Sequence, residues 1–268
     1  MPFAERYGPW ALVLGASEGL GEAFAHGIAA RGVNAVVVAR RAEQLQHVAD
    51  DLTQRHEVQG RAIAVDLNSP RFLDDLRAVT DDLEIGLVVY NAAASYVGEF
   101  EDQTVESMRS IVNVNCWGPL AVCEHFGRPM VRAGRGGILL MSSGAGLAGS
   151  AYNAAYSASK AFDLMLGESL WAEWRERGVD VLSVIGPAID TPTFRASMPP
   201  EAIAAMPPPM APAAVVAEVL DALGSAPSFV PGASNRQGIE ILGSLPRQKQ
   251  VEAMAAAHAA FAKHPEII

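Results

Sequence analysis

The stretch that decides the fold is Trp10-Ala11-Leu12-Val13-Leu14, followed directly by Gly15-Ala16-Ser17-Glu18-Gly19-Leu20-Gly21. The first five residues form an apolar run of strand length, and an amphipathic segment follows the glycines and ends near Gly32. A strand joined to a helix by glycines is a common place for a dinucleotide pyrophosphate, because the start of the helix offers free N–H groups. We therefore predict a strand at 10–14, a helix at 19–31 and a phosphate site between them. A plain tight turn, which also favours glycine, is the alternative.

Outward from this stretch, apolar runs of strand length alternate with amphipathic helical segments. Further strands are expected at 34–39, 61–65, 86–90, 137–141, 179–185 and 228–230, and helices at 42–56, 104–133, 153–176, 213–223 and 254–263. This alternation predicts an α/β fold, a Rossmann-type doubly wound parallel sheet of about seven strands with helices on both faces. No linker or repeat interrupts the series, so we interpret 1–268 as a single NAD(P)-binding domain.

Composition and charge exclude several classes of partner. The chain has 268 residues, 50% of them hydrophobic, and a formal net charge of −10, which favours a buried core and argues against nucleic acid as a partner. Residues 1–6 do not show the basic region and apolar run of a secretory leader, and no run reaches the ~18 apolar residues that a membrane span requires, so neither segment is expected. We therefore expect a cytoplasmic protein with no membrane partner.

The histidines, cysteines and carboxylates outside the main motifs are expected to have structural or surface roles. The six histidines show no metal-ligand spacing, so no metal site is expected. Cys116 and Cys123 lie seven apart on a predicted helix, where core packing is favoured over a redox or metal role. Aspartates and glutamates on the predicted helices are interpreted as parts of solvated faces.

The residues that carry chemistry are Tyr156-Ser157-Ala158-Ser159-Lys160 and, thirteen residues before this stretch, Ser143. A tyrosine and a lysine four apart share one face of a helix, so the ammonium can sit beside the phenol. The cation lowers the pKa of the phenol, ordinarily near ~10, towards the range in which it exchanges protons at neutral pH. With the Ser143 hydroxyl holding a substrate oxygen, this set predicts carbonyl reduction or alcohol oxidation. Ser142 is expected on the opposite face of the strand end.

The end of the second predicted strand indicates which dinucleotide binds. An acidic residue there would bind the ribose hydroxyls, whereas Ala39-Arg40-Arg41 offers guanidinium groups suited to a 2′-phosphate. NADP(H) is therefore favoured over NAD(H). The alternative is that the two arginines are an ordinary solvated pair at the start of a helix. Glu18 conflicts with the preferred interpretation, because it adds a negative charge near the phosphates.

Two loops at the ends of later strands complete the predicted cofactor site. Asp66-Leu67 is placed to meet an adenine amino group, although a position near a helix N-cap is an equally ordinary use for Asp66 or Asn68. Asn91-Ala92-Ala93-Ala94 can pass small residues close to the cofactor, with a merely tightly packed loop as the alternative.

Together these motifs resemble the short-chain dehydrogenase/reductase family over about 10–191. They fall in the family's order: the glycine loop 15–21, Asp66, Asn91-Ala92-Ala93, Asn115, Ser143, Tyr156 with Lys160, and 187–191. The resemblance implies a catalytic tetrad of Asn115, Ser143, Tyr156 and Lys160. In the family the tyrosine is the general acid/base and the serine orients the substrate oxygen. The lysine binds the nicotinamide ribose and lowers the pKa of the tyrosine, and the asparagine anchors a water that relays protons.

The resemblance also implies the remaining cofactor contacts and the assembly. The residues expected to bind the dinucleotide are Gly15, Ser17, Glu18, Gly19, Leu20, Gly21, Arg40, Arg41, Asp66, Leu67, Asn91, Ala92, Ala93, Tyr156, Lys160, Pro187, Ile189 and Thr191. Leu14, Ala93 and Ala188 replace the family's usual threonine and two glycines, which bears on turn geometry and cofactor affinity. A homodimer or homotetramer is expected through the helices at 104–133 and 153–176.

In the family the segment after 187 closes over the substrate, so 188–212 is interpreted as a lid. Its methionines and Phe194 predict an apolar pocket, with packing of the lid on the core as the alternative. The expected substrate is a hydrophobic ketone or its secondary alcohol: a steroid, an acyl chain, or a cyclic or aryl ketone. Only Arg195 is cationic in 190–212, which argues against an acyl-CoA. The residues expected to bind substrate are Ser143, Leu147, Tyr152, Phe194 and Met198.

Two other functions are compatible with this scaffold. One is a catalytically silent dinucleotide-binding sensor or regulator, against which the intact tetrad argues. The other is an epimerase or dehydratase, which would act without net consumption of added NADPH.

Overall fold

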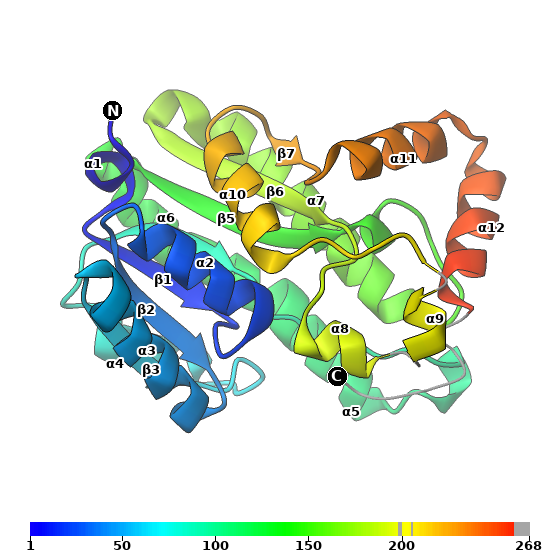
Figure 1. Ribbon diagram of the computed structural model, residues 1–268, viewed down its shortest axis with the longest axis horizontal. Coiled ribbons are helices and arrows are strands. Elements are labelled where there is room, and N and C mark those ends of the chain that lie inside the picture. The colour runs from blue at the N-terminus through cyan, green and yellow to red at the C-terminus, as the bar shows by residue number, and fades with distance from the viewer. Residues whose placement is uncertain (198–199, 205, 260–268) are drawn as a thin grey trace.

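One parallel sheet of seven strands organises the molecule, in the order β3-β2-β1-β4-β5-β6-β7 (Figure 1). The computed structural model describes residues 1–197, 200–204 and 206–259. The strands are β1 Trp10–Leu14, β2 Asn34–Ala39, β3 Gly60–Ala64, β4 Ile85–Tyr90, β5 Gly136–Ser143, β6 Val179–Gly186 and β7 Ser228–Phe229. The predicted doubly wound sheet is confirmed, and every predicted strand ends within two residues of its observed bounds. The strand order reverses between β1 and β4, the switch point at which such sheets bind ligands.

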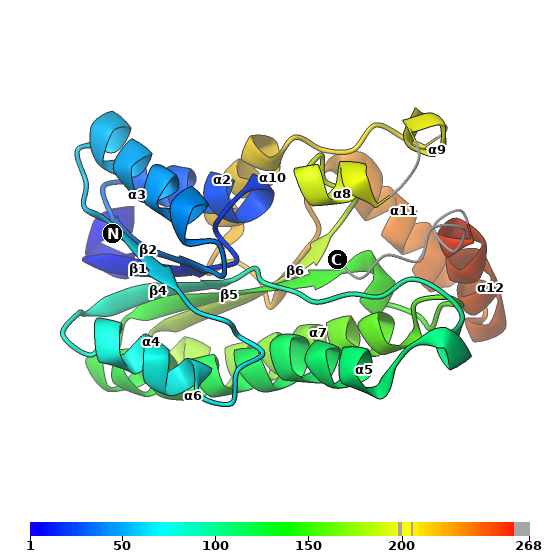
Figure 2. The same ribbon diagram turned by 90° about the horizontal axis from the view of Figure 1, so that it is seen from below.

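Helices cover both faces of the sheet (Figure 2). One face carries α2 Gly19–Ala29, α3 Ala42–His56 and α10 Pro212–Ala222. The other carries α4 Phe72–Thr80, α5 Val105–Val112, α6 Gly118–Ala133 and α7 Ala154–Trp174. Short 3-10 turns lie at Phe100–Asp102, Gly144–Gly146 and Arg175–Arg177.

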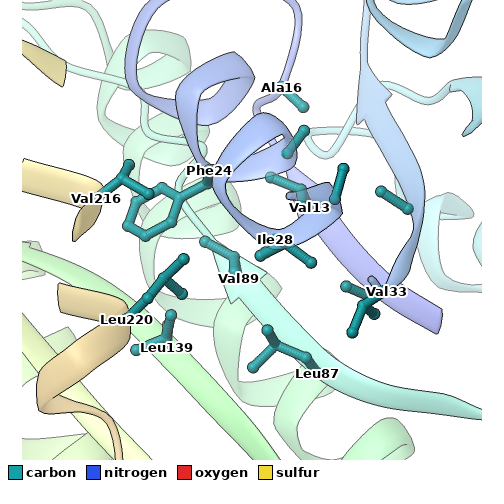
Figure 3. Packing of buried hydrophobic residues seen from close by; sticks show 14 of the residues in the cluster. Val13, Ala16, Phe24, Ile28, Val33, Leu87, Val89, Leu139, Val216 and Leu220 are labelled. Atoms are coloured by element: carbon teal, nitrogen blue, oxygen red, sulfur yellow. The ribbon is translucent and has the colours of Figure 1, made fainter. Parts of the chain in front are cut away.

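Two apolar clusters, one on each face, fix these layers. Successive residues of a strand point to opposite faces, so Val13 of β1 belongs to one cluster while Leu12 belongs to the other. Figure 3 shows the first cluster, in which Phe24 of α2 packs beside Val216 of α10. This packing holds the start of α2 against the end of β1, where the glycine loop lies.

Five features of the helical pattern differ from the sequence-based expectation. The short helices α1 Phe3–Tyr7 and α4 were not predicted, nor was α11 Ala233–Ser244, which buries no residue and so gives no periodic apolar signal. The last helix, α12 Arg247–His258, begins seven residues before the predicted 254–263, and 260–263 lie outside the described residues. The predicted helix 104–133 is divided by a π-helical turn, η2 Asn113–Trp117.

The lid segment 188–212 is a loop whose two ends are joined. Ile189 and Met210 form a parallel β-bridge, and the Met210 N–H donates to the Ala188 carbonyl at 3.0 Å. Between these ends lie α8 Pro192–Ala196 and α9 Pro200–Ala204, neither of which was predicted from the sequence. Both helices lie beyond the carboxyl edge of the sheet (Figure 1).

The C-terminal helix is attached to the loop that follows β5. Arg247 Nη1 donates to the Leu147 carbonyl at 2.9 Å, and Ser150 Oγ donates to the Met254 carbonyl at 3.2 Å. Among the helices of the described residues, none combines the length and the apolar character that crossing a membrane would require.

Candidate active site

The glycine loop is shaped by close backbone contacts. Gly15 has φ +81° and Gly19 has φ +61°, in the left-handed region that glycine tolerates best. A Cβ atom on Gly15 would lie 2.7 Å from the Ala92 nitrogen, and one on Gly21 only 2.0 Å from the Gly15 carbonyl oxygen. Internal packing alone therefore requires Gly15 and Gly21, as the tight-turn alternative proposed.

The start of α2 nevertheless keeps the features of an anion site. The N-cap residue, Glu18, makes no side-chain hydrogen bond to the helix, so the first N–H groups of α2 have no side-chain cap. Asn91, at the end of β4, joins this loop to the switch point because its Nδ2 donates to the Gly15 carbonyl at 2.9 Å. The loop, the helix start and the end of β4 thus meet at the carboxyl edge of the sheet.

Glu18 and Arg41 form a direct ion pair, which accounts for the charge conflict noted in the sequence. Arg41 Nη2 lies 2.8 Å from Glu18 Oε2 and donates to Ser17 Oγ at 2.8 Å. The other oxygen of Glu18 accepts from Thr193 Oγ1 of the lid at 3.2 Å. Arg40 is exposed and makes no ion pair with any residue of the described ranges. The carboxylate therefore neutralises Arg41 and leaves Arg40 as the free cation.

The predicted cofactor loop at Asp66-Leu67 uses its polar side chain within its own turn. Asp66 is exposed, and its Oδ1 accepts from the Asn68 N–H at 3.0 Å in the turn before α4. Leu67 is buried in the second apolar cluster. This turn matches the ordinary alternative for Asp66, and its contact with adenine stays a prediction.

Asn115 lies in the π-helical turn η2, a local widening of the helix that often accompanies functional sites. Its side chain is fully buried and holds the backbone of Ala94: Oδ1 accepts from the Ala94 N–H at 2.7 Å, and Nδ2 donates to the Ala94 carbonyl at 2.8 Å. Nδ2 also donates to Ser159 Oγ at 2.9 Å. Asn115 therefore fixes the loop after β4 to α7, the helix that carries Tyr156 and Lys160.

Tyr156 and Lys160 lie together on α7, which packs against β5, the strand that Ser143 ends. The Lys160 ammonium lies 5.7 Å from the centroid of the Tyr156 ring, as the spacing of four along α7 predicted. Ser143 ends β5 half-buried, and its Oγ accepts from the Ala145 N–H at 3.2 Å. Ser142 points to the other side, where its buried Oγ donates to the Lys160 carbonyl at 2.6 Å.

Asp163 corrects the expectation that the helical carboxylates are solvated. Its side chain is 3% exposed and its Oδ2 accepts from Lys160 Nζ at 3.0 Å, while the same ammonium donates to the Met141 carbonyl at 2.8 Å. Burial by itself would lower the pKa of Lys160, but the charge and hydrogen bond of Asp163 hold that pKa above its ordinary value. Neither Asp163 nor Ser159 was singled out as a site residue from the sequence.

Besides Ser143, the described members of the predicted substrate set lie on the segment between β5 and α7 and on α8. Tyr152 has φ +64°, an unusual conformation for a side chain of its size, and its carbonyl accepts from the Gly98 N–H at 2.8 Å. Leu147 follows the 3-10 turn after β5, and Phe194 lies half-buried on α8. Met198 lies outside the described residues. The single lid cation, Arg195, is paired with Asp190, with Nη2 2.7 Å from Oδ2.

The segment after β6 connects the lid with the cofactor loop. Pro187 and Ile189 follow β6, and Thr191 packs on the glycine loop, since a Cβ atom on Gly19 would lie 3.1 Å from Thr191 Cγ2. The Thr191 Oγ1 caps α8 by accepting from the Phe194 N–H at 3.1 Å. The start of the lid therefore lies directly against the start of α2.

Fold and site together define a nicotinamide-dependent oxidoreductase, and comparison with known proteins agrees. A family model described as short chain dehydrogenase matches residues 9–202, so the chain belongs to the short-chain dehydrogenase/reductase family. Named relatives of this family act on CH–OH or ketone groups, and the chain is an enzyme of that kind.

Particular relatives extend over nearly the whole chain. A 7beta-hydroxysteroid dehydrogenase of Collinsella aerofaciens is 32% identical over 89% of this chain and 92% of that protein. A structure from a study of 7beta-hydroxysteroid dehydrogenase stereoselectivity superimposes with a TM-score of 0.90, at 30% identity, and covers 95% of this chain and 99% of that one. A very-long-chain 3-oxoacyl-CoA reductase of Aspergillus clavatus, 35% identical, covers 65% of this chain and 52% of its own length. A short-chain dehydrogenase from Sphingobium yanoikuyae in complex with NADPH has a TM-score of 0.76, at 26% identity, and covers 89% of this chain and 96% of that one.

Proposed function

We propose that this enzyme uses NADP(H) to interconvert a bulky hydrophobic ketone, of the steroid class, and its secondary alcohol. The observation that carries the chemistry is the position of the Lys160 ammonium, 5.7 Å from the Tyr156 ring, with Ser143 ending the adjacent strand. The steroid class is supported by the extent of the match. The 7beta-hydroxysteroid dehydrogenase structure covers 95% of this chain, whereas the 3-oxoacyl-CoA reductase covers 65%. Pairing of Arg195 with Asp190 further disfavours an anionic carrier in the lid.

The residues present fit a phosphorylated dinucleotide. The uncapped start of α2 offers N–H groups to a pyrophosphate, and the helix dipole favours negative charge there. Arg40 is exposed at the end of β2, where a 2′-phosphate would require a cation. Arg41, paired with Glu18, is the second candidate for the same phosphate.

In the direction of reduction, a reduced nicotinamide held at this site would supply the hydride for the carbonyl carbon. The Ser143 hydroxyl holds the carbonyl oxygen, and the Tyr156 phenol donates the proton that this oxygen requires. The Lys160 ammonium stabilises the resulting phenolate because an adjacent cation favours the charged form. Asn115 fixes the Ala94 backbone to α7 and so holds the loop after β4 at a constant position relative to Tyr156 and Lys160.

The direct test follows the reduced-nicotinamide absorbance with NADPH or NADH and a panel of ketones. The panel contains steroids with a keto group at different ring positions, an aryl ketone and a 3-oxoacyl-CoA. We expect NADPH-dependent turnover of a steroid ketone, and its loss in Tyr156→Phe with NADPH binding retained. Turnover of the acyl-CoA alone would refute the substrate class. Equal activity of wild type and Tyr156→Phe would refute the assigned acid.

We further propose that two copies associate through α6 and α7. Large apolar side chains are exposed on these helices and at the end of η2, with Trp117 53%, Leu120 41% and Met165 55% exposed. Exposed apolar side chains of this size, when they lie together, are typical of a covered surface. Sedimentation velocity of wild type and Met165→Glu distinguishes the cases: a dimer that dissociates in the variant supports the proposal, and a monomeric wild type contradicts it.

A further inference from the structure

On the basis of the proposed function, we infer that Asp163 is a positioning residue which keeps Lys160 charged and in place beside Tyr156. The geometry is a buried triangle on one side of α7. Lys160 Nζ is held between Asp163 Oδ2 at 3.0 Å and the Met141 carbonyl at 2.8 Å. Two of the three ammonium protons thus have fixed partners, and the third remains for the Tyr156 side of the site.

Burial makes this pairing necessary for the charge. The side chains of Lys160 and Asp163 are each 3% exposed, and a buried ammonium without a counter-ion tends to lose its proton. The neutral Met141 carbonyl replaces one hydrogen bond to water but supplies no charge. The carboxylate of Asp163 is therefore what lets a lysine at this depth remain an ammonium.

Stability alone does not account for the pair. Asp163 Oδ1 is buried and makes no hydrogen bond within the described part of the chain. A buried ion pair with an unsatisfied oxygen contributes little net stability, and apolar replacements of such pairs are often neutral or stabilising. The arrangement instead suits a group whose charge is used in chemistry.

The groups packed around the pair leave Asp163 as the anion that faces the ammonium. Tyr90 of β4, Cys116 of η2 and Cys123 of α6 lie close enough to interact with Asp163. Burial raises the pKa of Cys123 to about 12 and raises that of Tyr90, so both are neutral at physiological pH. Burial likewise raises the pKa of Cys116. The remaining titratable group beside Lys160 is Tyr156 itself.

The composition of the chain permits a direct measurement of the lysine charge. The sequence contains only three lysines, Lys160, Lys249 and Lys263, so a protein labelled with ¹³C at the lysine ε-carbon gives three resolvable signals. A Lys160→Arg sample assigns the buried one. We expect the wild-type Lys160 signal to titrate above the ordinary pKa of lysine. In Asp163→Asn its midpoint should fall by at least about one pH unit.

The control removes the same charge from the same helix. Glu173 is an exposed carboxylate of α7, so Glu173→Gln should leave the Lys160 midpoint unchanged. Asp163→Ser removes the buried charge with a smaller side chain and replaces the Asn variant if that protein is not recovered folded. An unchanged Lys160 midpoint in the folded charge-removing variant overturns the inference. This readout requires no turnover, so it stands even if the proposed substrate class is wrong.

The pH dependence of kcat tests how the positive charge of Lys160 assists Tyr156. In Asp163→Asn the alkaline decline of kcat should move to lower pH by the same amount as the lysine midpoint, because a neutral Lys160 no longer stabilises the phenolate. KM should change less than kcat, and Asp163→Glu should restore part of the alkaline activity. A uniform loss of kcat at every pH would show a structural role only and contradict the positioning role.

Discussion

The side chain of Asn115 holds the backbone of Ala94 from both sides, accepting from its N–H at 2.7 Å and donating to its carbonyl at 2.8 Å. A third bond, from Nδ2 to Ser159 Oγ at 2.9 Å, connects the same amide to α7. One buried side chain thus joins the cofactor loop after β4 to the helix that carries Tyr156. The amide consequently has a structural duty beside any part in proton relay.

Replacing Asn115 by Ala should therefore lower the free energy of unfolding by about 2–4 kcal/mol, because the Ala94 N–H and carbonyl are left without partners. Urea unfolding followed by circular dichroism measures this. Asn113→Ala is the matched control, since its Nδ2 makes a single, exposed bond to Asn68 Oδ1 at 3.0 Å. An equal loss of unfolding free energy in the two variants would contradict this structural role of Asn115.

Removing the charge of Glu18 should tighten NADPH binding. In Glu18→Gln, Arg41 no longer has its ion-pair partner at 2.8 Å, while the amide oxygen can still accept from Thr193. The pair is partly exposed, so the expected gain is about two- to fivefold in Kd, from roughly 0.5–1 kcal/mol. Fluorescence titration measures it, and Glu22→Gln, in the first turn of α2, controls for general charge. An equal gain in NADPH affinity in both variants would show only the general electrostatic effect of removing a negative charge.

Arg40 should determine the preference for the phosphorylated dinucleotide. We expect Arg40→Ala to raise the Kd for NADPH about tenfold or more, the value of one charge-assisted contact, and to leave the Kd for NADH nearly unchanged. The comparison of both cofactors by the same titration separates loss of the 2′-phosphate contact from general damage. If NADH binding weakens equally, Arg40 serves the fold rather than the phosphate.

The N-terminal segment should depend on Asp180. Its Oδ2 accepts from Arg6 Nε at 2.5 Å and from the Tyr7 hydroxyl at 2.7 Å, which attaches α1 to β6. Asp180→Asn is expected to cost about 1–3 kcal/mol of unfolding free energy, since it leaves a partly buried guanidinium without its counter-ion. Asp221 offers a control, because it is 75% exposed and pairs with Arg31 at 2.8 Å. Asp221→Asn should cost less than about 1 kcal/mol.

Stability should fall on mild acidification because of His26. Its Nδ1 lies 3.0 Å from His56 Nε2, and burial, partly opposed by Asp51, lowers the pKa of His26 from 6.5. The unfolded chain therefore takes up this proton first as pH falls. The free energy of unfolding should decline as the pH falls from about 6.5 to the lower pKa that His26 has in the folded state. Below that pKa this contribution is fully lost. Urea midpoints between pH 7.5 and 5 measure how steeply stability depends on pH. This dependence should become weaker in His26→Gln, and an unchanged dependence would show that groups other than His26 cause it.

Much of this architecture could be predicted because the sheet is buried on both faces. Runs of β-branched residues such as Val36-Val37-Val38 favour a buried strand, so the strands were located closely. Helices that lack an apolar stripe were harder: α11 buries no side chain, and the five-residue α1 is too short to show a period. The π-helical turn at Asn113–Trp117 left no mark in the pattern either, because one extra residue per turn shifts the period only locally.

The site was predictable where its chemistry follows from spacing along one helix. Tyr156 and Lys160 are such a case, since four residues separate them on α7. Contacts between distant segments were not, because nothing local distinguishes a buried carboxylate from a solvated one. Asp163 was therefore expected in solvent, and Glu18 was seen as a repulsive charge before its partner Arg41 was known.

The attachment of α12 to the loop after β5 bears on the order in which the protein can fold. Every strand of the described sheet precedes α12 in the chain, because β7 ends at Phe229. The sheet and the glycine loop can therefore form before α12 docks. Docking then adds the hydrogen bonds from Arg247 to the Leu147 carbonyl and from Ser150 to the Met254 carbonyl.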